Sequence, residues 1–401
     1  MPLSWSLLAA MILAAAGFFV GRSRAFAASG GDVRSLHSRP TYHGANVALA
    51  VMLPALTVLA LASFARMAGI IPVTGGGFAG LLALGAAVAG LGWAVTRVES
   101  GFRARNLVER MVLGIMMFCS LIAIGTTVGI VLSLIFETIN FFEQYSIRQF
   151  FFSTEWSPRF EGNSRLGMLP LLWGTLYVSF IALLVAVPIG LLAAIYLSEY
   201  AGPRMRSIAK PVVEVLAGIP TIVYGLFALV TVGPLLRDWI AQPTGLGNSA
   251  SSVMTAGLVM GIMLIPFVSS LSDDIINAVP QSLRDGALGL GSTPSETVRS
   301  VVLPAALPGI VGAILLAASR AIGETMIVVL GAGAAATISG NPFEAMTTIT
   351  VKIVSQLTGD NDFSSPETLV AFALGLTLFV ITLGLNVIAL YIVRKYREQY
   401  E

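Results

Sequence analysis

Long apolar runs constrain this chain more than any other feature. They recur from residue 3 to residue 393, and each is about as long as the roughly 20 residues that a helix needs to cross some 30 Å of hydrocarbon. With 56% hydrophobic and 11% charged residues, the composition also lies far from that of a soluble domain. The runs are too long for the strands of a membrane barrel. We therefore predict an all-α polytopic membrane protein.

The runs and their flanking charges predict one topology. We expect nine spans, at about residues 3–20, 45–66, 73–95, 111–136, 168–197, 211–235, 252–272, 305–330 and 367–393. Arginine-rich connections at 21–43 and 97–110 predict a cytoplasmic side, which places the N-terminus outside and the C-terminus in the cytoplasm. The first run could instead be a signal peptide, but Arg22 and Arg24 follow it, whereas the positive charges of a signal peptide precede its apolar run.

Composition also limits the chemistry of the chain. A net charge of +2 gives no reason to expect a nucleic-acid partner. The single cysteine, Cys119, excludes an internal disulfide, and the two histidines, His37 and His43, lie before residue 106. None of the three lysines completes a G-x-x-x-x-G-K loop that would bind ATP. We expect no catalytic residue and no metal site in this chain.

A polar segment stands between the seventh and eighth apolar runs. Residues 285–304 contain Gly286, Gly289, Gly291 and Pro294 and are too polar to lie inside a bilayer. The apolar run that follows carries Arg320 and Glu324, four residues apart, which predicts one face of one continuous helix. A polar surface connection with helix-capping residues is the plain alternative for the loop, since Thr293 and Glu296 have the spacing of a helix start.

The spacing of this segment resembles the cytoplasmic loop of ABC-importer permeases, with its E-A-A, a glycine four residues later and a closing I-x-L-P. The residues that carry the resemblance are Asp285, Gly286, Ala287, Gly291, Val301, Leu303 and Pro304, of which Asp285, Gly286 and Val301 replace Glu, Ala and Ile. Glycine at position 286 predicts a less regular helix there. The stretches SRAIGETM and VVEVLAGIPTIVYGLF are similar to phosphate-importer permeases, and more to the PstC type than to the PstA type.

The resemblance implies an ABC-importer permease fold of six core helices, here with three additional N-terminal helices. It implies a division into residues 1–105, the extension, and residues 106–401, the permease core, with a coupling loop at 277–304. It further implies a bacterial inner-membrane complex that imports inorganic phosphate. The implied partners are a PstA-like permease, a PstB-like ATPase dimer that binds ATP and Mg, and a PstS-like periplasmic phosphate-binding protein.

Arg320 is the strongest candidate for the substrate path. It lies roughly 21 Å along the predicted helix, at a depth where a charge normally faces water or a partner. A guanidinium can bind phosphate through two parallel hydrogen bonds, and Glu324 would hold it when no anion is present. An Arg320–Glu324 pair that only fixes packing is the alternative. We interpret Glu214 as the ion-pair partner of Lys210, four residues before it.

Other functions remain open at this level. The residues alone do not distinguish phosphate from sulfate or molybdate. An ion-coupled secondary transporter would show paired halves with interrupted helices, which the sequence lacks. A scaffold protein would have no use for a buried arginine.

Overall fold

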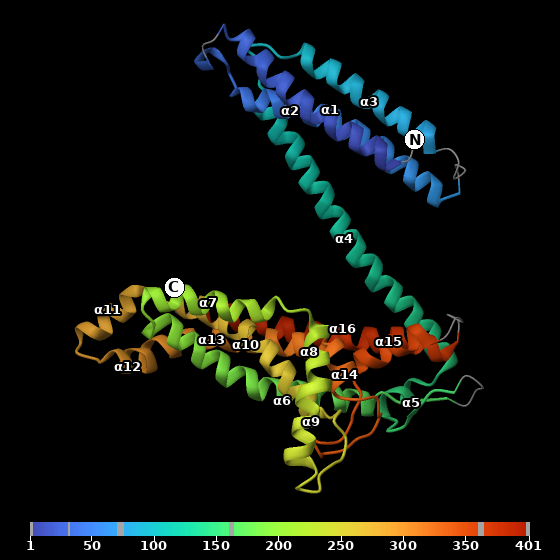
Figure 1. Cartoon of the computed structure of the whole chain (residues 1–401), viewed down its shortest axis with the longest axis vertical. Helices are drawn as coiled ribbons and strands as arrows, with labels where there is room; N and C mark the ends of the chain where they lie inside the picture. Colours follow the sequence, from blue (N-terminus) through green and yellow to red (C-terminus); the bar gives the residue numbers. More distant parts are fainter. Residues whose placement is uncertain (1–2, 31–32, 70–75, 160–163, 360–364, 398–401) are drawn as a thin grey trace. The chain divides into compact units, whose positions relative to one another are not determined.

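The computed structural model describes residues 3–30, 33–69, 76–159, 164–359 and 365–397, which are almost entirely helical (Figure 1). In this part of the chain, nine helices are long and apolar enough to cross a membrane, which confirms the predicted number. The chain divides into two compact units, residues 1–128 and 129–401. The division at residues 105/106 implied by the resemblance stays a prediction.

Unit 1 is built on three helices that lie side by side: α1 (Leu3–Ala28), α2 (Pro40–Met67) and α3 (Gly76–Thr96) (Figure 1). A short 3₁₀ turn, η1 (Val33–Ser35), precedes α2, and the first part of α4 (Ala104–Gln144) follows α3. Small residues let the backbones approach, since a Cβ at Gly90 would lie 1.9 Å from the Ala50 carbonyl oxygen. The close contact between α2 and α3 therefore depends on glycine at position 90.

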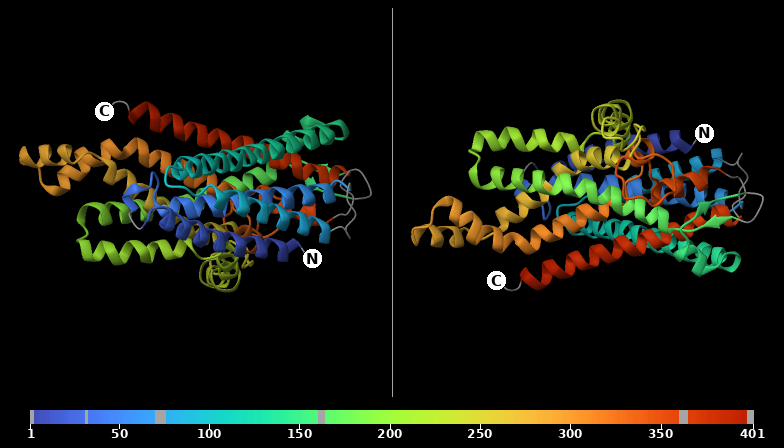
Figure 2. Two further views of the ribbon diagram at one scale, coloured as in Figure 1. Left: turned by 90° about the horizontal axis from the view of Figure 1, so that it is seen from above. Right: turned by 90° about the horizontal axis from the view of Figure 1, so that it is seen from below.

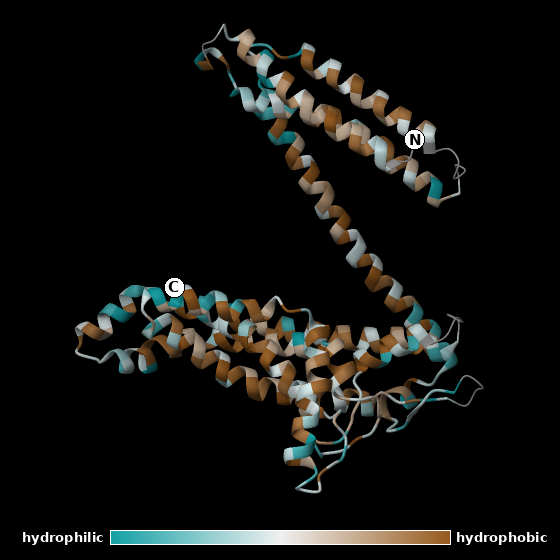
Figure 3. Ribbon diagram, in the orientation of Figure 1, coloured by the Kyte–Doolittle hydropathy of each residue, from teal (hydrophilic) through white to brown (hydrophobic). Residues whose placement is uncertain are grey.

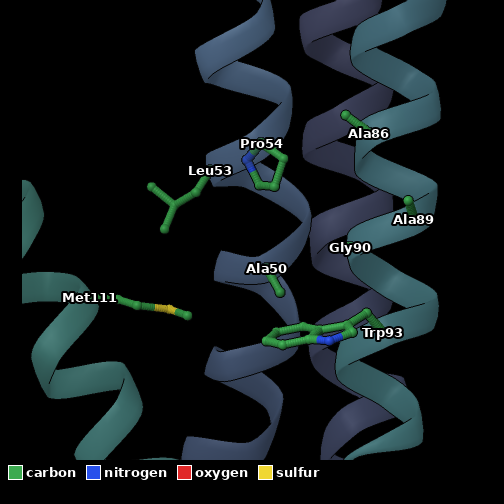
Figure 4. Close-up of a pocket in the computed structure, with 8 residues that line it drawn as sticks. All are labelled: Ala50, Leu53, Pro54, Ala86, Ala89, Gly90, Trp93 and Met111. Carbon is green, nitrogen blue, oxygen red and sulfur yellow. The ribbon is translucent and has the colours of Figure 1, made fainter.

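An apolar groove lies on this unit. Its lining comes from α2, α3 and α4 and includes Pro54, Trp93 and Met111, around a volume of about 560 Å³ (Figure 4). None of its lining residues is charged. The groove therefore offers nothing that would bind an anion.

Unit 2 contains the remaining helices. In chain order they are α5 (Ile147–Phe152), α6 (Leu169–Ile195), η3 (Tyr196–Tyr200), α7 (Pro203–Ala217), α8 (Thr221–Phe227), η4 (Ala228–Val232), α9 (Gly233–Leu236), η5 (Arg237–Ala241), α10 (Val253–Ala278), α11 (Gln281–Gly289), α12 (Pro294–Thr297), η6 (Val298–Val302), α13 (Leu303–Ile322), α14 (Met326–Gly331), α15 (Ile349–Gly359) and α16 (Pro366–Arg397). The four η segments are π-helical. Two short strands, β1 (Trp156–Ser157) and β2 (Arg165–Leu166), pair antiparallel with Trp156 opposite Leu166.

The core of unit 2 forms around α10. Of the most apolar stretch of α10, 67% is buried, against 6% of that of α16. Helix α6 packs along α10 because Gly257 and Gly261 leave room, since a Cβ at either position would come within 3 Å of Ile181 or Val185. Figure 3 shows the hydrophobic colour along α10, α13 and α16. Helix α10 is thus the inner element, and the exposed apolar surface of α16 suits a lipid or protein neighbour.

Several predicted spans are longer in the structure, such as the span expected at 111–136, which runs from Ala104 to Gln144, and two are shifted along the chain. The span expected at 211–235 runs instead from Thr221 to Ala241, because Gly218 ends α7 and Pro220 begins α8. The span expected at 305–330 begins at Pro294 and ends at Ile322, where Gly323 caps α13. Residues 323–325 then interrupt the apolar run before α14. Each shift falls at a glycine or proline, which membrane helices tolerate and which therefore gives no clear boundary signal in sequence.

Candidate functional site

The segment at 277–304 forms a helical hairpin at one end of unit 2 (orange in Figure 2, labelled α11 and α12 in Figure 1). Helix α11 ends before Gly291, whose φ of +91° is a conformation that few other residues adopt. Thr293 and Glu296 then form a capping box that starts α12. The hairpin therefore contains both the predicted glycine turn and the predicted helix start.

The residues named for coupling lie along this hairpin and the start of α13. Asp285 is exposed on α11, and Gln281 Nε2 donates to its Oδ1 at 3.1 Å. Gly286 lies inside α11, so the expectation of an irregular helix there is wrong. Val301 is half-buried in η6, Leu303 packs against a buried cluster with Ala306 and Ile276, and Pro304 is exposed in the first turn of α13. The coupling function of these residues remains a prediction.

The tip of the hairpin exposes apolar side chains. Leu290 is 91% exposed and Leu288 is 46% exposed, whereas Ala287 is buried against the hairpin. Large apolar side chains at an otherwise polar turn are costly in water and favoured under a protein partner. This surface is suited to docking.

A largely buried ion pair ties the hairpin to η3, the π-helical continuation of α6. Arg284 Nη2 donates to Glu199 Oε1 at 2.8 Å, and both side chains are only 12% exposed. The same guanidinium donates to the carbonyl oxygens of Ile276 and Val279 at the end of α10, at 2.8 Å and 2.6 Å. Arg284 therefore connects three elements, α11, η3 and α10. No local spacing predicts this pair, because its members lie 85 positions apart.

A second charged cluster joins α7 to α10. The buried Asp273 carboxylate accepts from Arg206 Nη2 at 3.1 Å and from Lys210 Nζ at 2.9 Å. The hydrogen bond to Asp273 raises the pKa of Lys210. Lys210 also lies 3.6 Å from Asp274. Among the residues that the structure describes, Lys210 makes no ion pair with Glu214, so the predicted Lys210–Glu214 pair is wrong.

Arg320 lies in the last turn of α13 and lines a cavity of about 240 Å³. Its guanidinium carbon is 5.4 Å from the centroid of the Phe267 ring, a cation–π arrangement. The other lining residues come from α7, α10 and the start of α8, and are Glu214, Ala217, Ile219, Thr221, Met263, Pro266 and Ser270. Arg320 forms no ion pair with a carboxylate of the described residues. Its donors are therefore available to an anion.

Glu324 does not share a helical face with Arg320, because α13 ends at Ile322. Its carboxylate instead accepts from the backbone N–H groups of Thr325 and Met326, at 3.1 Å and 3.0 Å, and so caps α14. The continuous helix and the Arg320–Glu324 pair are both wrong for the described residues, since Gly323 interrupts the run between them.

The structure separates the two predicted groups of residues. Arg320 and the coupling residues lie near opposite ends of α13, roughly 25 Å apart by helical rise.

Lys352 on α15 is a cation that the sequence analysis did not name as a site residue. Its Nζ donates to the Ala334 carbonyl oxygen at 3.3 Å, and burial lowers the pKa of this amine. Within the described ranges, no three His, Cys, Asp or Glu side chains gather as a metal site would require.

Two family models match the chain. Residues 186–398 match the binding-protein-dependent transport system inner membrane component, and residues 7–71 match a family described as phosphate ATP-binding cassette transporter.

Individual relatives agree with these matches. The chain is 30% identical to the probable ABC transporter permease protein YqgH of Bacillus subtilis, over 71% of this chain and 91% of that protein. It is 35% identical to the phosphate transport system permease protein PstC of Mesorhizobium japonicum, over 61% of this chain and 78% of that protein. It is 32% identical to PstC of Pasteurella multocida, over 72% of this chain and 92% of that protein. A structure of the MetNI methionine ABC transporter aligns with a TM-score of 0.45 and 19% identity, over 57% of this chain and 95% of that one.

Proposed function

Because the chain belongs to the family of binding-protein-dependent transport system inner membrane components, we propose that it is the permease subunit of an ATP-driven phosphate importer, of the PstC type. It is a multi-pass inner-membrane protein and a transport subunit, and ATP hydrolysis belongs to a partner chain. The match of residues 7–71 to the phosphate-transporter family is the observation that favours phosphate over other oxyanions. Relatives named for phosphate transport support the same choice.

The proposal includes the partners and the orientation. A PstA-like permease completes the path, a PstB-like ATPase dimer binds ATP and Mg, and a PstS-like periplasmic protein delivers inorganic phosphate. The hairpin at 277–304 docks on the ATPase through the exposed Leu290 and Leu288, on the cytoplasmic side. With nine spans, the N-terminus then lies outside and the C-terminus in the cytoplasm.

In this scheme Arg320 binds the anion on its path. The guanidinium keeps its charge at any physiological pH and can make two parallel hydrogen bonds to phosphate oxygens. The cavity it lines has room for more than a water molecule, whose share of liquid volume is about 30 Å³. Helix α13 connects this cavity to the docking hairpin, so movement of the hairpin reaches Arg320 through one rigid element.

The test is uptake of radiolabelled phosphate by vesicles that contain the complete complex, with ATP inside and the ion gradient collapsed. We expect ATP-dependent uptake by the parent, impaired uptake by Arg320→Lys, which loses the planar fork, and none by Arg320→Ala. Arg148→Ala, an exposed arginine outside the cavity, is the control. Uptake driven by an ion gradient without ATP would overturn the ABC mechanism, and parental uptake by Arg320→Ala would remove Arg320 from the path.

A further inference from the structure

The cavity at Arg320 has an acidic wall as well as a basic one. Glu214, on α7, lines the same cavity as Ser270 of α10 and Arg320 of α13 (α7, α10 and α13 are labelled in Figure 1). Neither Glu214 nor Arg320 forms an ion pair in the described part of the chain. The cavity therefore presents a carboxylate and a guanidinium that do not neutralise each other.

Among the described residues, the nearby cations bind other groups and form no ion pair with Glu214. Lys210, one helical turn before it, is held by Asp273 at 2.9 Å, and Arg206 is held by the same carboxylate at 3.1 Å. Both cations are thus directed to α10, and Lys210 is held away from the i,i+4 interaction with Glu214 that its position on α7 would allow. A negatively charged carboxylate in an anion path repels every anion and weakens its binding. We therefore expect this carboxylate to have a role in which it favours one anion over the others.

The chemistry of oxyanions supplies such a role. Near neutral pH, phosphate retains at least one proton, whereas sulfate and molybdate retain none. A carboxylate is an acceptor without a proton of its own, so it can accept a hydrogen bond from a P–OH group. A fully deprotonated anion has no O–H group that could donate to the carboxylate, and the two negative charges repel each other. A guanidinium alone would attract all of these anions.

We propose that Glu214 is a specificity-determining residue that makes the Arg320 cavity select protonated phosphate over sulfate and molybdate. This rests on the proposed function, since it takes the phosphate path past Arg320 as its premise. Arg320 supplies the attraction for the anion, and Glu214 accepts the hydrogen bond that only a protonated oxyanion can donate. Both side chains are exposed, so the selection comes from the extra hydrogen bond to protonated phosphate and from charge repulsion of fully deprotonated anions.

The experiment measures binding to the purified complex of permeases and ATPase in nanodiscs, without the periplasmic binding protein, so that the selectivity of delivery does not enter. Radiolabelled phosphate is the probe, and sulfate is the competitor. Glu214→Gln keeps the size of the side chain but replaces the acceptor-only carboxylate with an amide that can donate to sulfate. We expect the affinity for sulfate relative to phosphate to rise about tenfold, the worth of one hydrogen bond to a charged group.

Two variants complete the design. Glu214→Asp keeps the carboxylate and should keep most of the preference for phosphate, and Glu143→Gln, an exposed glutamate outside the cavity, should leave the ratio unchanged. If Glu214→Gln does not assemble, Glu214→Ala removes the same acceptor and should show the same rise.

The outcomes separate this inference from the proposed function. An unchanged ratio in Glu214→Gln, with phosphate binding abolished in Arg320→Ala, overturns the inference and leaves the Arg320 path standing. Parental phosphate binding in Arg320→Ala, together with an unchanged ratio in Glu214→Gln, overturns both.

Discussion

Glu324 shows how one side chain can hold a helix break in place. The peptide groups after α13 have lost their helical partners, and two of the exposed N–H groups donate to the Glu324 carboxylate. The Thr350 hydroxyl donates to the Glu324 carbonyl oxygen at 2.9 Å and ties the break to the first turn of α15. In an apolar environment each of these groups would otherwise be costly to leave unpaired. Glu324 is thus a helix cap at the break.

This role predicts that two variants of Glu324 lose different amounts of stability. Glu324→Ala removes the cap and should lower the stability of the complex by about 1 kcal/mol, the usual cost of losing an N-cap acceptor. Glu324→Gln retains an acceptor oxygen and should cost less. Thermal denaturation of the purified complex measures both. Equal losses in the two variants would mean that the charge, and not the cap, is what matters at this position.

At the scale of elements, the Arg284–Glu199 pair is the link that should transmit movement of the hairpin. Glu199→Gln or Arg284→Gln strands one buried charge, and breaking such a pair costs about 3–5 kcal/mol. We expect both variants to hydrolyse ATP with reduced phosphate uptake per ATP. The exchange Arg284→Glu with Glu199→Arg should recover part of the loss.

The exposed Arg165–Glu155 pair is a matched control, since both side chains are more than half exposed and Glu155→Gln should change little. Full coupling in Glu199→Gln, measured as phosphate transported per ATP hydrolysed, would show that the hairpin does not act through this contact.

Gly291 and Gly286 make a second comparison within the hairpin. Nothing lies within 4 Å of a Cβ built at either position, but only Gly291 has a positive φ. Gly291→Val should therefore strain the turn by about 1–3 kcal/mol and uncouple ATP hydrolysis from transport. Gly286→Ala, in the interior of α11, should stabilise the helix by roughly 0.5–1 kcal/mol. Co-purification of the ATPase and uptake per ATP measure both, and normal coupling in Gly291→Val would contradict the docking role of this turn.

The sequence predicted these elements unevenly. The nine spans follow from apolar length, and the turn at Gly291 follows from glycine chemistry, so both were available from the residues alone. The break after Ile322 was not, because Gly323 stands inside an apolar run that a membrane helix could have continued through. The partners of Arg284 and Lys210 depend on which helices pack together, and for Lys210 the local spacing predicted Glu214, which is nearer in the sequence than the observed partner Asp273.

At the scale of the whole molecule, unit 1 has its own buried clusters, formed by α1, α2, α3 and the short segments that flank them. We predict that a chain with a new start directly before Arg103, which removes nearly all of the extension at residues 1–105, retains part of the phosphate uptake, because the residues proposed for the path and for coupling all lie in unit 2. Uptake by vesicles with the truncated complex at matched levels is the measurement. Complete loss of uptake, with the complex shown to be assembled, would make unit 1 part of the mechanism.

The proposed orientation makes a separate prediction about accessibility. After Cys119 is replaced by serine, single cysteines at Gly30 and Leu290 should react with an impermeant maleimide only from the cytoplasmic side, and cysteines at Glu155 and Ala345 only from outside. Labelling of right-side-out and inverted vesicles distinguishes the sides. One reversed position would break the proposed arrangement of the nine spans.

The exposed tip of the hairpin also bears on the life of the chain before assembly. A newly inserted copy displays Leu290 to water until a partner covers it, and such a patch is what chaperones and proteases recognise on unassembled subunits. Copies made in excess of the partner are then removed, while assembled copies persist. The same leucine that serves docking would thus let the supply of the partner set how much of this chain accumulates in the membrane.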